Sequence, residues 1–365
     1  MSEWQTFCLK DLGKIVGGAT PPTNNPKNYG NKIAWITPKD LSTLQGRYIK
    51  KGSRSISRLG FKSCSCVLLP KHAILFSSRA PIGYVAIAKK RLCTNQGFKS
   101  IIPNKKIYFE FLYYLLKYHK DSISNIGGGT TFKEVSGATL GLFKVKIPPT
   151  YYEQQKIART LSVLDQKIEN NHKINELLHT LAYKIYEYYF KYKPKNAKLE
   201  QIIIENPKSN IMVKNAQKTQ DKYPFFTSGD NILSYPKAII DGRNCFLNTG
   251  GNAGIKFYVG KASYSTDTWC ICANEFSDYL YLLLSSIKTH INQSFFQGTS
   301  LKHLQKNLLK KYPIYMPSAH EIKKFNQIII PLLTLISINT RTSKKLEQIR
   351  DFLLPLLLKQ QVKPK

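Results

Sequence analysis

The sequence predicts an α+β protein in which one unit, an α/β domain followed by a long helix, is present twice. Three observations lead to this fold class. Short β-rich runs bounded by Gly and Pro occupy residues 1–150 and 194–317, as expected for compact α/β domains. Heptad patterns follow each domain, in residues 151–193 and 318–360, and predict two long antiparallel coiled-coil helices. Several motifs recur at a nearly constant offset, which predicts an internal pseudo-two-fold repeat rather than a solenoid.

The recurrence is clearest at the end of each α/β domain. Gly129–Lys133 reads GTTFK, and Gly298–Lys302 reads GTSLK at an offset of 302 − 133 = 169. Upstream, Ile82–Val85 matches Ala253–Lys256 at an offset of 254 − 83 = 171. A molecule made of two similar units can present two similar surfaces, which is the arrangement needed to read a target in two pieces.

Each α/β domain is predicted to contain short strands, because β-branched and aromatic residues stand between turn residues. The strands expected from these runs are Ile33–Ile36, Cys66–Leu69, Ala73–Phe76, Gly83–Ile87, Ile239–Ile240, Cys245–Leu247 and Trp269–Cys272. Tyr108–Tyr118 is expected to be a helix. Pro148 and Pro149 end the first domain, and Glu153 carries a charge that is favourable in the first turn of the following helix.

The two long helices are predicted from apolar residues that step alternately by four and three positions from Ile157 and from Phe325, an offset of 325 − 157 = 168. Asn171 and Asn339 occupy the same place in the two series. A polar residue at such a position lowers stability but selects one alignment, so both are expected to pair the helices in a single register. The alternative is that each helix packs only on its own domain. Two prolines in the second series predict a kinked or shortened second helix.

The chain of 365 residues is strongly basic, with 55 Lys and Arg against 22 Asp and Glu and a formal charge of +33. This excess predicts a polyanionic partner, and nucleic acid is the first candidate. A membrane surface, the acidic face of a partner protein, or simply a Lys-rich host proteome are the alternatives.

The seven cysteines are odd in number and show neither a disulfide framework nor a C-x-x-C pair, so free thiols in a reducing cytosol are expected. The N-terminal residues lack the basic and apolar regions of a signal peptide, and no apolar run is long enough to span a bilayer. These features predict a soluble cytoplasmic protein without a membrane segment.

Three pairs of matched loops carry small polar side chains that suit phosphates or base edges. The pairs are Phe76–Gly83 with Leu247–Gly254, Thr94–Phe98 with Thr266–Trp269, and Gly127–Thr131 with Gln297–Ser300. Ordinary turn chemistry would explain the same residues, but their recurrence in both copies favours binding. The residues expected to contact DNA are Ser77, Ser78, Arg79, Thr94, Asn95, Gln96, Thr130, Thr131 and Lys133 in the first domain, and Thr227, Ser228, Asn231, Thr249, Asn252, Thr266, Asp267, Thr268, Thr299, Ser300 and Lys302 in the second.

Motifs for catalysis or cofactor binding are missing from the sequence. There is no G-x-x-x-x-G-K-[ST] loop and no strand-linked Gly-x-Gly signature for a nucleotide or S-adenosylmethionine. Ile147–Thr150 superficially resembles the Asn/Asp-Pro-Pro-aromatic motif of amino-methyltransferases, but Ile147 has no side-chain acceptor and Thr150 has no ring. The histidines form no pair at metal-binding spacing. The chain is therefore expected to bind rather than catalyse, with no metal and no cofactor of its own.

One passage joins a turn, a strand, a diproline and a helix start in order. It consists of Gly129–Lys133, Lys146–Pro149, Glu153–Ala158, Leu161 and Leu164–Asp165. It resembles the GTT, IPLPP and EQxxIAxxLxxLD hallmark of the specificity (S) subunits of type I restriction-modification enzymes, and the resemblance extends over essentially the whole chain. The second copy, at Pro317–Ile322, lacks the diproline and the Glu-Gln pair.

The resemblance implies two target recognition domains separated by two conserved spacer helices, with each domain reading half of a split, asymmetric sequence in the major groove of double-stranded DNA. It also implies a non-catalytic subunit that docks two methyltransferase subunits and the restriction subunits. S-adenosylmethionine, ATP and Mg would then belong to those partner subunits. A fused methyltransferase-nuclease, a stand-alone DNA-binding scaffold and the specificity subunit of a related type II-like enzyme are the alternative functions.

Overall fold

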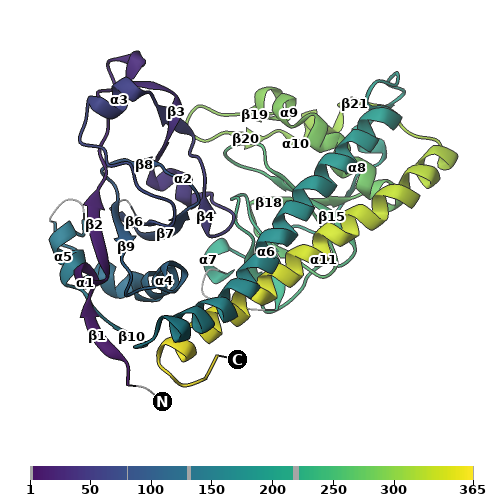
Figure 1. The fold of residues 1–365 in the computed structure, drawn as a ribbon. Coiled ribbons are helices and arrows are strands. Elements are labelled where there is room, and N and C mark those ends of the chain that lie inside the picture. Colours follow the sequence, from purple (N-terminus) through teal and green to yellow (C-terminus); the bar gives the residue numbers. More distant parts are fainter. Residues whose placement is uncertain (1–2, 80, 130–132, 217–221, 365) are drawn as a thin grey trace. The chain divides into compact units, whose positions relative to one another are not determined.

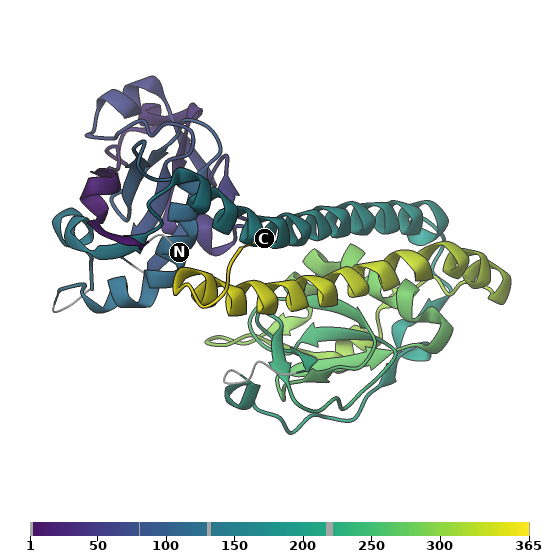
Figure 2. The same cartoon turned by 60° about the horizontal axis from the view of Figure 1, so that its bottom comes forward.

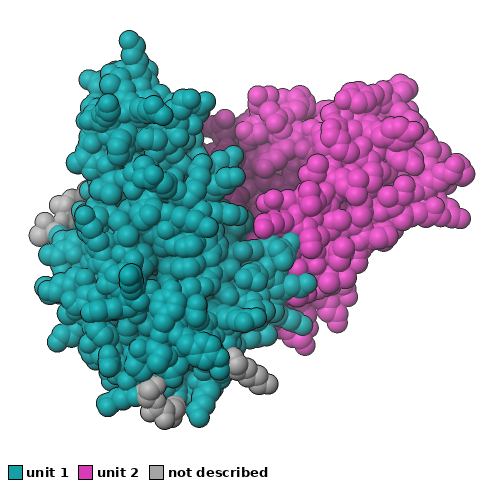
Figure 3. All heavy atoms as spheres, in the orientation of Figure 1, with its two compact units in different colours: residues 1–170, 343–365 teal, residues 171–342 magenta. Residues whose placement is uncertain are grey.

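The computed structural model contains two compact units, which Figure 3 shows in different colours. The residues that the structure describes are 3–79, 81–129, 133–216 and 222–364. Unit 1 contains residues 1–170 and 343–365, and unit 2 contains residues 171–342. Each unit combines one α/β domain with part of each long helix, so the fold is α+β as predicted (Figure 1). This division cuts both long helices, whereas the sequence-based boundaries fall at the ends of the helices.

Unit 1 is built around a five-stranded sheet in the order β2-β9-β6-β7-β4. Its strands are β2 (Gly13–Gly17), β4 (Tyr48–Ile49), β6 (Ile74–Ser78), β7 (Ile82–Ala88) and β9 (Lys99–Pro103). Strand β4 is parallel to β7, and the other neighbours are antiparallel. A three-stranded sheet in the order β5-β3-β8 contains β3 (Tyr29–Ile36), β5 (Arg54–Ile56) and β8 (Cys93–Thr94), and β1 (Gln5–Cys8) pairs with β10 (Lys144–Ile147).

Helix α4 packs on the five-stranded sheet of unit 1. Its buried residues Phe111 and Leu112 share one core cluster with Phe76 of β6 and Ile101 of β9. Residues 111–116 are all buried, so α4 is covered on more than one side. The predicted helix at Tyr108–Tyr118 is confirmed and continues to Asn125. The helices of this domain are α1 (Leu9–Leu12), η1 (Pro26–Asn28), α2 (Pro38–Ser42), α3 (Arg58–Lys62), α4 (Phe109–Asn125) and α5 (Gly137–Leu142).

Unit 2 contains a four-stranded sheet in the order β12-β18-β15-β16 and a three-stranded sheet in the order β14-β13-β17. The strands of these sheets are β12 (Ile204–Glu205), β13 (Tyr223–Phe226), β14 (Leu233–Tyr235), β15 (Arg243–Asn248), β16 (Ile255–Val259), β17 (Ser263–Tyr264) and β18 (Thr268–Cys272). Two smaller pairs join β11 (Ala197–Lys198) to β21 (Pro313–Ile314) and β19 (Phe296–Gln297) to β20 (His303–Leu304). The helices of this domain are η3 (Leu199–Gln201), α7 (Val213–Ala216), η4 (Asn274–Phe276), α8 (Ser277–Ser286), α9 (Lys288–Ser294) and α10 (Lys306–Lys310).

The strand orders of the two units correspond wherever the sequence repeats. The order β2-β9-β6-β7 of unit 1 corresponds to β12-β18-β15-β16 of unit 2, and β5-β3-β8 corresponds to β14-β13-β17. Each three-stranded sheet has one parallel pair, which joins Trp35 to Cys93 in unit 1 and Phe225 to Ser263 in unit 2. The predicted internal repeat is therefore confirmed in the topology of the strands.

The long helices are α6 (Tyr151–Tyr186), which continues into a π-helical turn η2 (Glu187–Lys191), and α11 (Ala319–Leu358). Within unit 2 they run antiparallel, because Asn175 contacts Asn339 while Tyr189 of η2, further along the chain, packs edge-on against Phe325 near the start of α11. Figure 2 shows α11 lying along the strands of unit 2, where its buried apolar residues join the same core cluster as β15 and β18.

Helix α11 continues through Pro331 and Pro355, so the expected shortening of the second helix is wrong. A proline removes one main-chain hydrogen bond from a helix interior. Ile329 and Leu333, on either side of Pro331, are both buried in the core of unit 2, and this packing holds the helix together across the missing bond.

Two of the predicted strands are wrong. Cys66–Leu69 is irregular apart from one bridge between Leu69 and Leu92. Ile239–Ile240 likewise forms only one bridge, to Ala262. Both runs are short. Cys66–Leu69 is followed by Pro70, which has no main-chain N–H to donate to a ladder, so its pairing stops after Leu69.

All seven cysteines are free thiols. No group of three or more His, Cys, Asp and Glu side chains within the described ranges is placed to hold a metal ion. Among the described residues, no helix combines the length and the apolar character that crossing a bilayer requires.

Candidate nucleic-acid interface

The three candidate loops of unit 1 meet at the end of β6. The main-chain N–H of Ser78 donates to the carbonyl of Gly97 at 2.8 Å, and the carbonyl of Ser78 accepts from the N–H of Val135 at 3.0 Å. Arg79 extends the contact, since its Nη1 lies 3.6 Å from a carboxylate oxygen of Glu134. The last residue of β6, Ser78, thus joins the loop before β9 to the loop that precedes α5.

The equivalent loops of unit 2 meet in the same way at the end of β15. The N–H of Thr249 donates to the carbonyl of Asp267 at 3.1 Å, and the carbonyl of Thr249 accepts from the N–H of Leu304 at 3.0 Å. A further main-chain bond joins Gly251 to the carbonyl of Lys302 at 2.9 Å. Each unit therefore gathers its three matched loops into one cluster, and the same main-chain hydrogen bonds hold both clusters.

Five of the candidate residues are buried and serve to shape these loops. They are Ser77, Ser78, Thr94, Thr227 and Thr268. The hydroxyl of Ser77 donates to the carbonyl of Pro81 and accepts from the N–H of Tyr84, both at 2.8 Å. The hydroxyl of Thr227 accepts from the N–H of Gly229 at 3.1 Å. In this conformation such hydroxyls hold turns together rather than face solvent.

The exposed candidate side chains of unit 1 are Gln96 and Lys133, with Arg79 at 36% exposure. Asn95 is half-buried, and its Oδ1 accepts from the N–H of Gly97 in a tight turn. Thr130 and Thr131 lie outside the described residues. Glu134 was not among the expected residues although it follows Lys133 directly. It holds Arg79 and also Lys99, whose Nζ lies 3.2 Å from Glu134 Oε1.

Unit 2 exposes a larger set of polar side chains at its cluster. The exposed candidates are Asn231, Asn252, Asp267, Thr299, Ser300 and Lys302, and the half-buried ones are Ser228, Thr249 and Thr266. The hydroxyls of Ser228 and Thr249 both donate to the carbonyl of Asp267. The hydroxyl of Thr266 donates to Oδ1 of Asp267 at 3.3 Å. Exposed His303, which the sequence patterns did not single out, adjoins Lys302 and pairs with Gly250 across a β-bridge.

The two clusters share a main-chain frame but differ in the charged groups that they present. Arg79 of unit 1 corresponds to Gly250 of unit 2 (250 − 79 = 171), and Glu134 corresponds to His303 (303 − 134 = 169). Unit 1 thus presents an Arg and Glu pair where unit 2 has glycine and histidine. Two surfaces of this kind have the same framework and different hydrogen-bonding patterns.

A half-buried lysine supports the cluster of unit 2. Lys256 on β16 donates through Nζ to the carbonyl of Thr227 at 2.8 Å and to Oδ1 of Asn248 at 3.2 Å. Burial lowers the pKa of this ammonium group. The corresponding residue of unit 1 is Val85 (256 − 85 = 171), so only the second cluster has this polar support.

The two expected helix-pairing residues lie in unit 2. Asn339 Nδ2 donates to Oδ1 of Asn175 at 3.0 Å. Asn171 is buried. The amide that meets Asn339 is therefore that of Asn175, one helical turn along α6 from Asn171.

The long helices also carry exposed apolar side chains. On the unit 2 part of α6 and η2, Leu177 is 71% exposed and Tyr188 is 86% exposed. On the unit 1 part of α11, Phe352 is 69% exposed. Large apolar groups left in solvent are typical of surfaces that bind another protein.

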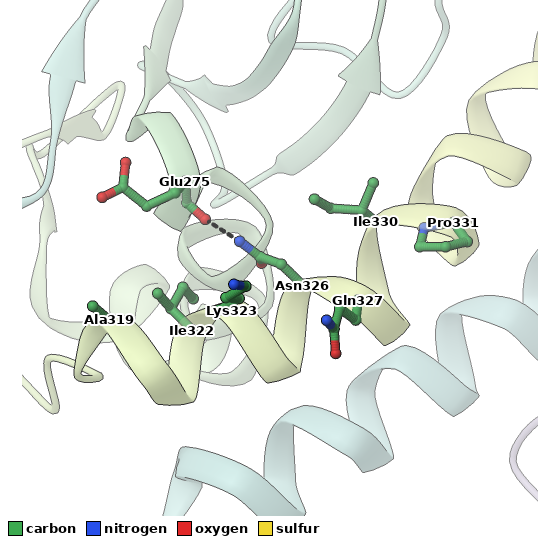
Figure 4. A pocket seen from close by; sticks show the side chains of 8 residues that line it. All are labelled: Glu275, Ala319, Ile322, Lys323, Asn326, Gln327, Ile330 and Pro331. Atoms are coloured by element: carbon green, nitrogen blue, oxygen red, sulfur yellow. Dashed lines mark hydrogen bonds between the residues drawn. The ribbon is translucent and has the colours of Figure 1, made fainter.

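A pocket of about 540 Å³ lies beside the first turns of α11 in unit 2. The residues that line it are Glu275, Ala319, Ile322, Lys323, Asn326, Gln327, Ile330 and Pro331. Figure 4 shows Asn326 reaching toward Glu275, whose carbonyl accepts its Nδ2 at 2.7 Å. Oδ1 of Asn326 is buried without a hydrogen-bond partner among the described residues. Like the exposed apolar side chains above, this mainly apolar pocket lies on one of the long helices.

Comparison with known proteins decides what kind of chain this is. Residues 1–180 and residues 195–348 match the family described as the type I restriction modification DNA specificity domain. The chain belongs to this family. The resemblance drawn from the Gly129–Asp165 passage is confirmed, and a match in two separate ranges agrees with the predicted internal repeat.

Individual relatives support the same assignment. The type I restriction enzyme MjaIX specificity subunit of Methanocaldococcus jannaschii is 32% identical over 403 aligned residues, which cover 98% of this chain and 93% of that protein. The HindI specificity subunit of Haemophilus influenzae is 30% identical over 177 residues, covering 46% of this chain and 37% of that protein. The crystal structure of a type I restriction-modification S subunit from M. genitalium gives a TM-score of 0.62 at 18% identity, covering 97% of this chain and 96% of that one. This last likeness supports the fold.

Proposed function

We propose that this chain selects the DNA target of a type I restriction-modification complex, with each recognition domain reading one half of a bipartite sequence. The observation that carries the proposal is the pair of loop clusters, which share main-chain hydrogen bonds but differ in exposed side chains. One cluster carries the half-buried pair Arg79 and Glu134, and the other carries half-buried Gly250 and exposed His303 at the same positions. Because base edges are read by hydrogen bonds in the grooves, the two half-sites should have different sequences.

The charge of the chain supports the choice of DNA as its ligand. A formal charge of +33 attracts the phosphate backbone at long range, independently of sequence. The exposed Lys133 and Lys302 stand at equivalent places in the two clusters, which suits them to phosphate contacts. In this division of labour, lysines supply affinity while the residues that differ between clusters supply specificity.

The partners in this proposal are methyltransferase subunits, two of them, and restriction subunits. The exposed apolar groups of the long helices, including Leu177 and Tyr188 in unit 2 and Phe352 in unit 1, are suitable anchors for the methyltransferase subunits. Each unit offers one such region, which supports a stoichiometry of two. Chemistry that requires S-adenosylmethionine, ATP or Mg would belong to these partners, and this chain would be non-catalytic.

Co-expression with a type I methyltransferase subunit from the same host tests the proposal. The chain should co-purify with the methyltransferase, and the pair should methylate DNA at one asymmetric interrupted sequence that the methyltransferase alone does not methylate. A chain that binds DNA but never associates with a methyltransferase would instead be a stand-alone scaffold. A chain that binds S-adenosylmethionine by itself would be an enzyme.

A further inference from the structure

A buried arginine links the α/β domain of unit 1 to helix α6. Arg47 lies between α2 and β4, and its side chain is only 3% exposed. Its main-chain N–H and its Nε donate to Oε1 of Glu169 on α6, at 2.9 and 3.2 Å. Its Nη1 donates to Oε1 of Glu110 on α4 at 3.1 Å. One residue therefore joins the helix of the domain to the long helix by directional hydrogen bonds.

The same network reaches helix α11. Asp165 on α6 is 5% exposed and accepts from Nη1 of Arg350 on α11 at 2.7 Å and from the hydroxyl of Tyr114 on α4 at 2.5 Å. Gly46 allows the chain to approach α6 closely, because its φ is +114° and a Cβ at this position would lie 2.9 Å from Cγ of Glu169. The domain is thus tied to both long helices within unit 1.

Unit 2 has a linkage of the same kind built on a different arginine. Arg243 on β15 donates through Nε to Oδ2 of Asp278 on α8 at 2.6 Å and through Nη1 to Oγ1 of Thr334 on α11 at 2.9 Å. Asp278 corresponds to Glu110 of unit 1 (278 − 110 = 168) and is 2% exposed. The acid is therefore shared between the copies, while the arginine comes from β15 in one and from the segment before β4 in the other. Both units keep the link between domain helix and long helix.

We propose that Arg47 and Arg243 are positioning residues that hold each recognition domain in one orientation on its long helix and thereby set the spacing between the two half-sites. The inference rests on the proposed function, because it concerns the spacing of the same bipartite target. Neither arginine lies in the loop clusters, so neither is assigned a contact with DNA.

The hydrogen bonds of these links are suited to fixing the orientation of each domain on its long helix. Apolar contacts are non-directional, so they restrict the orientation of a domain on its helix less sharply than hydrogen bonds do. A guanidinium group presents donors in a rigid planar fork, and a rotated domain would leave buried carboxylates without partners. One base pair corresponds to about 3.4 Å along the duplex and about 34–36° around it. A domain released from its arginine could reach a half-site displaced by this amount.

The test uses the full chain in complex with its methyltransferase subunits. DNA substrates keep both half-sites and lengthen or shorten the spacer by one base pair. The variants are Arg47→Met with Glu169→Met, and Arg243→Met with Asp278→Asn, so that one carboxylate is removed with each arginine. Glu110, the second partner of Arg47, keeps the hydroxyls of Tyr48 and Tyr108 as donors. Arg47→Lys and Gly46→Ala are milder variants that disturb the geometry if a double variant does not fold.

Two control variants separate orientation from stability and from charge. Ile36→Val weakens a core cluster formed only by residues of the domain, and Arg54→Met removes an exposed arginine. The linkage variants should lose at least about tenfold of the discrimination against the altered spacer, with both half-site sequences unchanged. Wild-type discrimination in folded linkage variants, or the same loss in Ile36→Val, would overturn the inference. A wild-type complex that methylates no bipartite sequence would overturn the proposed function itself, and this inference with it.

Discussion

The side-chain amide of Asn339 donates a hydrogen bond to Oδ1 of Asn175 at 3.0 Å, so the two long helices meet through a pair of amides inside unit 2. Nδ2 of Asn175 lies 3.4 Å from both the carbonyl of Ile336 and the hydroxyl of Thr340. A slipped alignment would leave these amides without partners in a mainly apolar contact. The pair therefore favours one register of α6 against α11.

Replacing Asn175 and Asn339 together by Leu is expected to raise the midpoint of thermal unfolding. Removing both members of a polar pair and replacing them with apolar groups is usually neutral or stabilising. The single change Asn175→Leu leaves Asn339 unpaired and should destabilise by about 1 kcal/mol. A double variant that unfolds at a lower temperature than the single variant would contradict this account of the amide pair.

DNA affinity is expected to fall steeply with salt. Each phosphate that the protein neutralises contributes about 0.9 to the slope of log affinity against log salt concentration. Replacing Arg79, Lys133 or Lys302 with Ala should each lower that slope by about 0.9, the contribution of one phosphate. Lys173→Ala, an exposed position on α6, serves as the control. The measurement is a binding titration at several salt concentrations, and an affinity that stays flat would remove the case for a polyanionic ligand.

The differences between the two loop clusters should account for the asymmetry of the target. The double change Arg79→Gly with Glu134→His gives the first cluster the residues of the second at these positions. The expected result is a changed preference in the first half-site and none in the second, because the altered groups are confined to unit 1. Selection from a library with both half-sites randomised measures this. An altered second half-site would show that the domains do not read independently.

Stability at acid pH should depend partly on Glu321. Hydrogen bonds from Lys193, from the main chain of Ser318 and from Tyr315 lower the pKa of this carboxyl to about 2. A depressed pKa stabilises the fold above the ordinary value near 4.5, and this contribution is lost as the pH falls toward 2. Glu321→Gln should therefore show a shallower loss of unfolding free energy over that window. The difference in unfolding free energy between the two proteins should stay under about 1 kcal/mol, because the ion pair of Lys193 and Glu321 is largely solvated. An unfolding free energy with the same pH dependence in the wild type and in Glu321→Gln would contradict this role of Glu321.

The repeated motifs made the fold largely predictable, since Gly129–Lys133 and Gly298–Lys302 mark the same place in two copies of one topology. Local composition was less reliable. Cys66–Leu69 has the residues of a strand, but the proline that follows limits it to one bridge.

The candidate site was predictable only in part. Matched loops identified the two clusters, yet Ser77 and Ser78 turned out to be buried, because a hydroxyl that can contact DNA can equally close a turn. The link from Arg47 to Glu169 could not be predicted, since it joins residues far apart in sequence, and the arginine that makes the similar link in unit 2, Arg243, lies on a different element.

The central claim, that two recognition domains read two different half-sites, is tested most directly by the methylome of the host. Strains carrying this gene should be compared with strains that lack it and with strains in which residues 1–150 are replaced by the matching domain of another family member. The account predicts one asymmetric interrupted motif that disappears without the gene and changes in only one half after the exchange. An uninterrupted or palindromic motif, or an exchange that alters both halves, would contradict it.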